Sequence, residues 1–395
     1  MQEVVIVGAA RTPFGLYRGE LASQRAQDLA ANSMKEAVAR AGIDSAKYDA
    51  SIYSESVQTS LPANVSRHGW LLAGFSEDPA GFTMNTLCAG AIQTMFSAYN
   101  KIVAGEYKLF MTGGIGTSSQ APYYVFHPRY EFGPQSMCFH DQKLEIQTNA
   151  QPVDRYGELT FTDLADIIAS NNGLSRLQLD QYTAASKAKA IAALKNGAFK
   201  DAISPIVKKV KKAEVTIDTD EALKKTVSLE ELMAMPATNC CGNASEGNVA
   251  AMADGSASIV LASADAAKEL GATPLAKVAG FGIAAGNPTL IERTTVKSIE
   301  KALKSAGISM SDVDYIDLHE QSAAYAVAVN NLLGADAAAK INVDGGSLAF
   351  GHAGAATGGA MVVNMVYRLQ RTGANCGLVN VGALGGQSLS IVIKK

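Results

Sequence analysis

The sequence lacks several features that would assign it to a specialised class of protein. Charged residues make up only 18% of the 395 residues, and 34 basic against 37 acidic side chains leave a formal net charge of −3. A nucleic-acid-binding protein normally carries a basic patch and a high pI, so this balance argues against a nucleic-acid partner. No apolar stretch reaches about 18 residues, so we expect no membrane-spanning helix. With 48% hydrophobic residues, the chain is also too apolar to be disordered.

Cysteines and cofactor motifs are equally sparse. The five cysteines include the adjacent pair Cys240 and Cys241 and no Cys-x-x-Cys spacing, so we expect neither a disulfide framework nor a structural metal site. The segment 280–285 has the letters G-x-G-x-x-A, but the helix after it begins too late for a dinucleotide site, so we expect no redox cofactor. The N-terminus lacks the pattern of a signal peptide, which favours a cytoplasmic protein.

Short β-branched runs alternate with alanine-rich stretches along the chain. Runs at 4–7, 52–53 and 107–112 predict strands. The stretches at 29–41 and 89–104 predict helices, because their apolar residues recur at helical spacing. Strands that alternate with helices of this length are typical of βαβ units, so we expect an α/β fold with a mostly parallel sheet.

An internal repeat is the most informative feature of the sequence. Residues 32–55 align without a gap with residues 297–320, and both segments contain Ala-Gly-Ile and close on a glutamate. Further on, Cys88 and His352 take nearly equivalent places, each at the start of an alanine- and glycine-rich helix. The chain therefore reads as two copies of one α/β unit, with unrelated residues from about 116 to 245 between them.

Cys88 is the first candidate for chemistry. A thiol at a helix N-terminus is expected to have a lowered pKa, and the backbone N–H groups beside it could hold an oxyanion. Taken alone, such a cysteine is more often a small buried residue than a nucleophile. Its counterpart in the repeat is His352, however, and His319 closes a predicted strand of the second copy. Two-fold pseudosymmetry would bring these three residues together as a nucleophile with bases.

The sequence resembles the thiolase family over essentially its full length. The resemblance rests on five motifs that occur in thiolase order: VVIVGAARTPFG at the N-terminus, NTLCAGA around Cys88, GNAS at 242–245, GGSLAFGHAGA around His352, and GALGGQ near the C-terminus. It implies a duplicated, five-layered αβαβα fold with an inserted loop domain. The expected N-terminal half spans 1–118 and is completed by about 254–270. The loop domain spans 119–253, and the C-terminal half spans 271–395.

The resemblance also implies the chemistry of an acyltransferase that acts on coenzyme A thioesters. Cys88 would take an acyl group from a 3-oxoacyl-CoA, and His352 would deprotonate Cys88 and later the thiol of coenzyme A. The backbone N–H groups of Cys88 and Leu384 would form an oxyanion hole, and Ser245 would lie along the pantetheine arm of coenzyme A, which is a substrate here. Thiolases associate as dimers or tetramers, so we expect a homodimer or a dimer of dimers.

Two departures from the family pattern stand out. His319-Glu320-Gln321-Ser322 replaces the usual Asn-Glu-Ala-Phe, so that His319 could donate directly to a thioester enolate oxygen. The histidine version resembles thiolase-like proteins related to the sterol-carrier type, many of which work with a small zinc-binding OB-fold partner. Gly382 occupies the place of the cysteine that serves as acid and base at the α-carbon, and Cys376, upstream on the predicted strand, is a poor substitute. That leaves His319, His352, a substrate group or water for this proton.

We therefore expect an atypical thiolase that cleaves a 3-oxoacyl-CoA with coenzyme A. Bulky, branched or aromatic substrates fit the missing cysteine, and the aromatic segment 123–132 could line their pocket. Benzoylsuccinyl-CoA is one such substrate. One alternative is a decarboxylating or acyl-transferring condensing enzyme, in which loss of carbon dioxide creates the carbanion. Another is a non-catalytic CoA-binding subunit of an assembly.

Overall fold

A single mixed sheet, made of two halves, runs through the centre of the protein. The computed structural model describes residues 2–126, 138–210, 213–240 and 242–395. The strand order is β4-β3-β5-β10-β1-β11-β14-β13-β12, and the short strand β2 (Gly15–Leu16) pairs with β10. Only two residue pairs join β1 to β11, so the halves meet there.

The first half consists of β1 (Val4–Arg11), β3 (Ala50–Glu55), β4 (Ala80–Met84), β5 (Leu109–Thr117) and β10 (Ala253–Ser263). The second half consists of β11 (Ala276–Ala285), β12 (Tyr315–Leu318), β13 (Cys376–Ala383) and β14 (Gln387–Lys394).

The two halves repeat the same strand order. From the centre outward, β1, β10, β5 and β3 correspond to β11, β14, β13 and β12. The expectation of a mostly parallel sheet is wrong, because only β3–β4, β3–β5 and β12–β13 are parallel pairs within this sheet. The cause is the last strand of each copy. It runs against both of its neighbours, and in the second copy β14 follows β13 through a turn in which Gly385 and Gly386 have positive φ angles.

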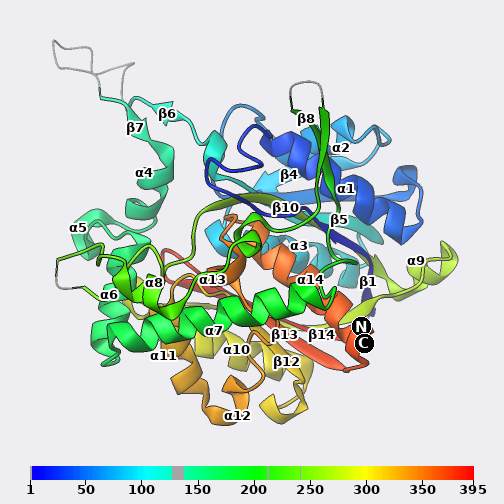
Figure 1. Cartoon of the computed structure of the whole chain (residues 1–395). Helices are drawn as coiled ribbons and strands as arrows, with labels where there is room; N and C mark the ends of the chain where they lie inside the picture. The colour runs from blue at the N-terminus through cyan, green and yellow to red at the C-terminus, as the bar shows by residue number, and fades with distance from the viewer. Residues whose placement is uncertain (1, 127–137, 211–212, 241) are drawn as a thin grey trace.

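Helices cover both faces of the sheet and also fill the space between its halves. The central helices α3 (Gly90–Val103) and α14 (Ala356–Thr372) contact each other and strands of both halves. The outer helices α1 (Ala26–Ala41) and α10 (Ile291–Ala306) pack on the first and second half respectively (Figure 1). Further helices are α2 (Val65–Leu72), α9 (Ala264–Glu269), α11 (Ala323–Leu333), α12 (Ala335–Ala338) and α13 (Ser347–Phe350). The result is the five-layered α/β architecture that the resemblance implies.

The repeated Ala-Gly-Ile motif marks equivalent helix ends. Gly42 closes α1 and Gly307 closes α10, both in the left-handed region with φ of 65°. An L-residue with a side chain rarely adopts this conformation, so glycine is required at both positions. The motif therefore ends the outer helix of each half in the same way and returns the chain toward the sheet.

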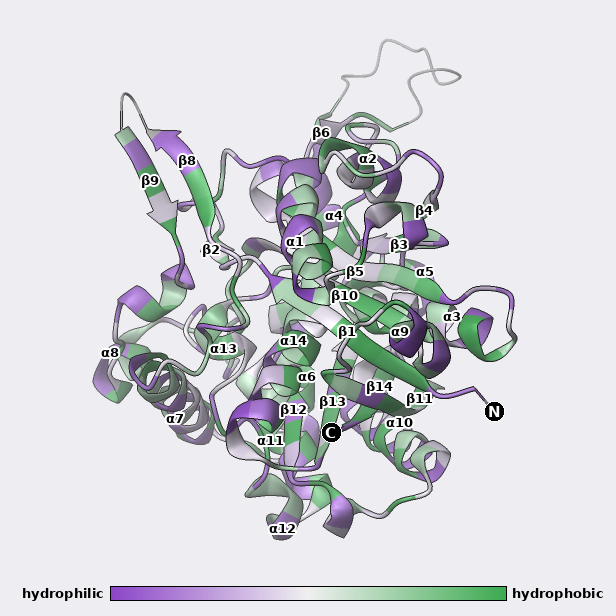
Figure 2. Cartoon of the chain, turned by 90° about the vertical axis from the view of Figure 1, so that its right-hand side faces the viewer, coloured by the Kyte–Doolittle hydropathy of each residue, from purple (hydrophilic) through white to green (hydrophobic). Residues whose placement is uncertain are grey.

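A long segment is inserted between β5 and β10. It contains β6 (Tyr123–Tyr124), β7 (His140–Asp141), α4 (Gln142–Thr148), α5 (Val153–Tyr156), α6 (Phe161–Asn171), α7 (Arg176–Lys195), β8 (Ile206–Val210), β9 (Ala213–Ile217) and α8 (Leu229–Ala234). Helix α7 packs against α11 and α13 of the second half, whereas the β8–β9 hairpin projects from the body (Figures 1 and 2). The insertion thus covers one end of the sheet.

The hydropathy of the elements follows their layer. The strands of the central sheet are largely hydrophobic (Figure 2), whereas α7 mixes polar residues with alanine and leucine and exposes Leu177. Many of the strand residues are fully buried in the core clusters of the two halves. Among the described residues, no helix combines the length and apolarity that crossing a bilayer requires.

Candidate active site

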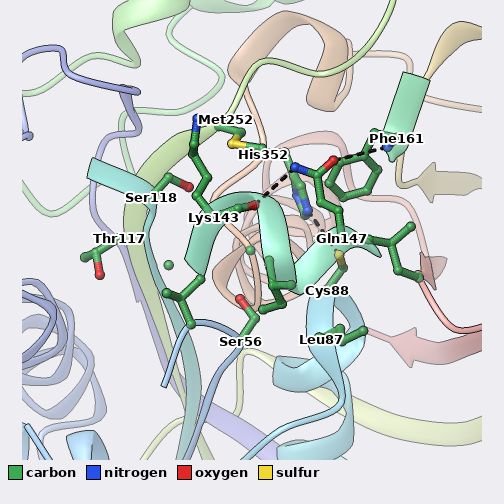
Figure 3. Close-up of a pocket in the computed structure, with 15 residues that line it drawn as sticks. Ser56, Leu87, Cys88, Thr117, Ser118, Lys143, Gln147, Phe161, Met252 and His352 are labelled. Atoms are coloured by element: carbon green, nitrogen blue, oxygen red, sulfur yellow. Dashed lines mark hydrogen bonds between the residues drawn. The ribbon is translucent and has the colours of Figure 1, made fainter. Parts of the chain in front are cut away.

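A pocket opens where the two halves and the inserted segment meet. Cys88 and His352 lie in its wall. The short 3₁₀ helix that carries Cys88 (Leu87–Ala89) contacts both α14 and β13 of the second half. The inserted segment contributes Lys143 and Gln147 from α4 and Phe161 from the start of α6 (Figure 3). Apolar side chains form most of the remaining wall: Val57, Leu87, Ile146, Met252 and Leu384.

Cys88 and His352 are in direct contact, as the repeat predicts. The Cys88 Sγ lies 3.1 Å from the His352 Nε2, and both side chains are buried (Figure 3). The residue before Cys88, Leu87, has a φ of 52°. This conformation is strained for a side chain with a Cβ, and such strain is typical of sites where the backbone must aim a reactive group.

Thr357 orients the ring of His352. The His352 Nδ1 lies 2.8 Å from the Thr357 Oγ1, which also accepts the Ala353 N–H at 3.0 Å. In the tautomer whose Nδ1–H donates to this oxygen, the Nε2 is an acceptor that can take the proton of Cys88. The ring of Phe161 packs edge-on against His352 at a centroid distance of 5.8 Å and shields this contact.

Burial determines the charge state of this pair. It raises the pKa of Cys88 to about 12, although the N–H groups of Leu384 and Cys88 itself act in the opposite direction. The expectation that the helix N-terminus lowers this pKa is therefore wrong, because desolvation outweighs the backbone donors. Burial and the neighbouring His319 also lower the pKa of His352 well below its ordinary value. At rest the two groups form a neutral thiol–imidazole pair.

The N–H groups of Cys88 and Leu384 converge on the sulfur from opposite halves of the molecule. Both donate toward the Cys88 Sγ, and Leu384 also lines the pocket. A carbonyl carbon bonded to this sulfur would hold its oxygen close to the same donors. Such a pair of backbone donors can stabilise a developing oxyanion without reorganisation.

His319 lies beside His352, with the ring centroids 4.5 Å apart. Its Nδ1–H donates to the carbonyl of Gly382 at 3.0 Å, and its buried Nε2 has no hydrogen-bond partner among the described residues. Burial lowers its pKa to about 4. In the neutral ring the Nε2 is an acceptor. The predicted donation from His319 to an enolate oxygen therefore requires a protonated ring, which this environment disfavours.

Glu320 is fully buried, and the sequence alone does not show whether its role is catalytic or structural. Its carboxylate accepts hydrogen bonds from Tyr182 at 3.0 Å and Ser186 at 2.8 Å, both on α7, and from Asn342 at 2.7 Å. The backbone N–H of Leu348 adds a fourth at 3.2 Å. This carboxylate therefore ties the inserted segment to the second half, directly behind His319.

Three other sequence expectations concern residues away from the sulfur. Ser245 is fully buried, its hydroxyl has no partner among the described residues, and it is not part of the pocket wall, so its contact with pantetheine stays a prediction. Tyr123 and Tyr124 line a different hollow, and 127–137 lie outside the described residues; Phe161 supplies the aromatic wall instead. Cys376 begins β13, about 20 Å along the strand from Gly382.

No group of three or more histidine, cysteine, aspartate or glutamate side chains suited to a metal ion occurs within the described part of the chain. The site is instead a thiol, two neutral imidazoles and two backbone donors. This set of groups can form and break an acyl–sulfur bond.

Two family models cover nearly the whole chain. Residues 4–265 match "Thiolase, N-terminal domain", and residues 272–395 match "Thiolase, C-terminal domain". The sequence is 30% identical to an acetyl-CoA acetyltransferase of Syntrophomonas wolfei and 33% identical to a beta-ketoadipyl-CoA thiolase of Pseudomonas knackmussii. Each alignment covers 100% of this chain and 99% of the relative. The structure superposes on human mitochondrial 3-ketoacyl-CoA thiolase in complex with CoA with a TM-score of 0.93 and 30% identity, covering 100% of this chain and 98% of that one.

Proposed function

The chain belongs to the thiolase family and is an acyltransferase, and we propose that it cleaves 3-oxoacyl-CoA thioesters with coenzyme A through an acyl-Cys88 intermediate. The observation that carries the proposal is the 3.1 Å contact between the Cys88 Sγ and the His352 Nε2. A thiol needs a neighbouring base to become a nucleophile at neutral pH, and this base faces it with a lone pair. Coenzyme A is a substrate of this reaction.

The first half-reaction transfers the acyl group to the protein. The Cys88 proton passes to the His352 Nε2, and the sulfur attacks the C3 carbonyl of the substrate. The N–H groups of Cys88 and Leu384 stabilise the oxygen of the resulting adduct. Breaking the C2–C3 bond then leaves the acyl group on Cys88 and releases the other fragment as a CoA thioester, once its C2 has gained a proton.

The second half-reaction releases the acyl group to coenzyme A. The incoming thiol gives its proton to the His352 Nε2 and attacks the acyl-Cys88 carbonyl, whose oxygen lies at the same two N–H groups. The Cys88 sulfur leaves and recovers the proton from His352. One base thus serves both steps, and its orientation is fixed by Thr357.

The side chains that line the pocket also favour a particular class of 3-oxoacyl-CoA substrate. Its wall is mostly apolar, but Lys143 lies in it, with its ammonium 4.5 Å from the ring centroid of Tyr17. None of the described carboxylates forms an ion pair with Lys143, so its charge is available to a ligand. We therefore propose a 3-oxoacyl-CoA with a bulky apolar or aromatic part and a free carboxylate. Benzoylsuccinyl-CoA has both features, and β-ketoadipyl-CoA has the free carboxylate.

Thiolysis assays with a panel of thioesters test the activity and the substrate class. We expect benzoylsuccinyl-CoA or β-ketoadipyl-CoA to be cleaved faster than acetoacetyl-CoA or 3-oxohexanoyl-CoA. Lys143→Met should raise KM for the carboxylated substrates about 10- to 100-fold, as expected for a lost charge-assisted hydrogen bond, and leave the neutral ones unchanged. Lys101→Met, which removes a distant exposed lysine paired with Glu106, is the matched control. Consumption of a malonyl donor without release by free CoA would instead indicate a condensing enzyme.

A second copy of the chain is the partner that the sheet edge favours. Strand β4 ends the sheet, and its Phe82 is 43% exposed next to α2, where Leu71 and Leu72 are also exposed. We propose a homodimer through this edge, because exposed strand edges with apolar side chains pair readily. Phe82→Glu should shift the mass measured by light scattering to that of a monomer. Co-expression with a small zinc-binding OB-fold protein would test the other expected partner.

A further inference from the structure

The proposed reaction leaves one proton without a donor. When the C2–C3 bond breaks, its electron pair stays on C2, which must be protonated. The Nδ1–H of His319 is bound to the Gly382 carbonyl, so its Nε2 is an acceptor. At this stage His352 holds the Cys88 proton on its Nε2, which faces the sulfur. A second group, on the Gly382 side of the site, would give a proton to C2 and then be reprotonated by His352.

The hydroxyl of Tyr325 occupies the space in front of Gly382. A Cβ added at Gly382 would lie 2.5 Å from the Tyr325 Oη and 3.0 Å from its Cζ. Tyr325 comes from α11, one turn after the segment that carries His319, and is fully buried. The hydroxyl thus fills the volume that a side chain at position 382 would otherwise occupy.

The hydrogen bonds of Tyr325 connect it to the site rather than only to the core. The Tyr325 hydroxyl lies 2.6 Å from the Thr295 Oγ1, donates to the Asn380 Oδ1 at 3.4 Å, and has the backbone of Gly382 beside it. The carbonyl of the same Gly382 accepts the Nδ1–H of His319. Burial is the main cause that raises the pKa of Tyr325, and the charges of Glu292 and Cys88 add to it, so the phenol and the thiol lie within electrostatic reach of each other. A hydroxyl and an acceptor imidazole therefore lie at Gly382, two residues before Leu384 in the pocket wall.

We propose that Tyr325 is a catalytic residue that protonates C2 of the departing thioester, and removes a proton from C2 when the reaction runs in reverse. This inference rests on the proposed thiolase function. The electron pair of the C2–C3 bond forms the new C2–H bond with the hydroxyl proton. The phenolate then receives the proton that His352 took from Cys88, so the net change is transfer of the Cys88 proton to C2. No oxidant, reductant or further reactant is needed.

The test compares two reactions that share Cys88 and His352 but differ in the need for a proton at C2. Thiolysis of a 3-oxoacyl-CoA requires that proton. Exchange of labelled CoA into a thioester that has no 3-oxo group, measured with acetyl-, butyryl- and benzoyl-CoA, forms and breaks acyl-Cys88 without it. Tyr325→Phe should lower kcat for thiolysis about 100- to 10,000-fold, the usual contribution of a general acid, and leave exchange within about threefold of wild type.

Tyr53→Phe is the matched control. Tyr53 is also fully buried, its ring packs against Gly113, and its hydroxyl contacts the Ser258 Oγ. This variant should leave both reactions within about threefold of wild type when the purified protein is folded. Equal losses of both reactions in Tyr325→Phe would show a structural role, and no loss of thiolysis would show that the hydroxyl is not used. Either result overturns the inference, whereas a wild-type protein without exchange overturns the proposed function itself.

A second measurement does not depend on the stability of that variant. Incorporating 3,5-difluorotyrosine at position 325 keeps the shape of the side chain and lowers the pKa of its hydroxyl. The alkaline limit of thiolysis should then move to lower pH, while that of CoA exchange stays in place. Unchanged pH profiles for both reactions would contradict a proton transfer by Tyr325.

Discussion

The two halves of the molecule contain the same arrangement of a glycine, a tyrosine and a serine, with different consequences. In the first half, Gly113 on β5 pairs with Ser258 on β10, and Tyr53 packs against the glycine. In the second half, Gly382 on β13 pairs with Ser388 on β14, and the hydroxyl of Tyr325 lies against the glycine.

The two tyrosines come from different elements of secondary structure, and this explains their different surroundings. Tyr53 is part of β3 and is buried within the first half. Tyr325 belongs to α11 of the second half and lies near His319 and within electrostatic reach of Cys88. The duplicated scaffold therefore holds a structural tyrosine on one side and one with a role in the proposed chemistry on the other.

The residues that precede the two central helices, α3 and α14, also differ between the halves. Cys88 precedes α3 in the first half, and His352 precedes α14 in the second, so neither half alone has both a nucleophile and its base. Leu384 from the second half supplies one of the two N–H groups at the sulfur. The site is formed by the contact between the halves, and variants in equivalent positions should have unequal effects.

The largest effect is expected at the nucleophile. Cys88→Ala should reduce both thiolysis and CoA exchange by at least about four orders of magnitude, because no acyl intermediate can form. Cys376→Ala, at a buried cysteine of the second half, is the control and should leave both rates unchanged at a cost of about 1 kcal/mol in stability. A large loss of activity in Cys376→Ala would mean that the second half supplies a thiol after all.

The next largest effect is expected at the base. His352→Ala should lower both reactions about 100- to 10,000-fold, since each half-reaction uses its Nε2. Thr357→Val removes the acceptor that orients the ring and should cost less, about 10-fold, in both reactions. If His352→Ala impaired thiolysis and left exchange intact, the base for Cys88 would have to be sought elsewhere.

A matched pair of glycine substitutions sharpens the comparison of the halves. Gly382→Ala places a Cβ against the Tyr325 hydroxyl, and Gly113→Ala places one 2.3 Å from the Ala257 carbonyl and 2.6 Å from the Tyr53 ring. Both should lower the free energy of unfolding by about 1–3 kcal/mol or more, because the core cannot absorb the extra atom. Only Gly382→Ala should also slow thiolysis per folded molecule, about 10- to 100-fold, by displacing Tyr325. Equal activities of the two variants would remove the distinction between the halves.

The smallest effect is expected from pH near neutrality. Burial lowers the pKa of His352 and of His319, the latter to about 4, and raises that of Cys88 to about 12. His352 therefore stays unprotonated, and Cys88 stays a thiol, across the neutral range. We expect kcat/KM for CoA exchange to vary less than about threefold between pH 6.5 and 9 and to fall only at lower pH, where His352 gains a proton. An acidic limb with its midpoint near the ordinary histidine pKa would contradict a neutral thiol–imidazole pair.

The sequence alone predicted the features of the molecule that depend on local patterns of residues. The gapless alignment of residues 32–55 with 297–320 predicted the duplication. Beyond it, Cys88 and His352 take nearly equivalent places, each at the start of an alanine- and glycine-rich helix. The expectation of a mostly parallel sheet was wrong because the alternation of strands and helices does not show the direction of β10 and β14, each of which runs antiparallel to both of its neighbours.

The remaining features depend on contacts between distant segments. The pKa of Cys88 is set by how deeply the two halves bury it, which the helix N-terminus does not reveal. Phe161 reaches the pocket only because the inserted segment folds over it. Tyr325 follows no motif, and only its distance to Gly382 distinguishes it from other buried tyrosines.

The central claim is that Cys88 carries the acyl group, and intact-mass spectrometry tests it most directly. The protein is incubated with a 3-oxoacyl-CoA in the absence of free CoA and then with CoA. We predict an added mass equal to the acyl group, located on Cys88 by peptide mapping, absent in Cys88→Ala and lost when CoA is supplied. An adduct on another residue, or none with any of the tested 3-oxoacyl-CoAs, would contradict the account.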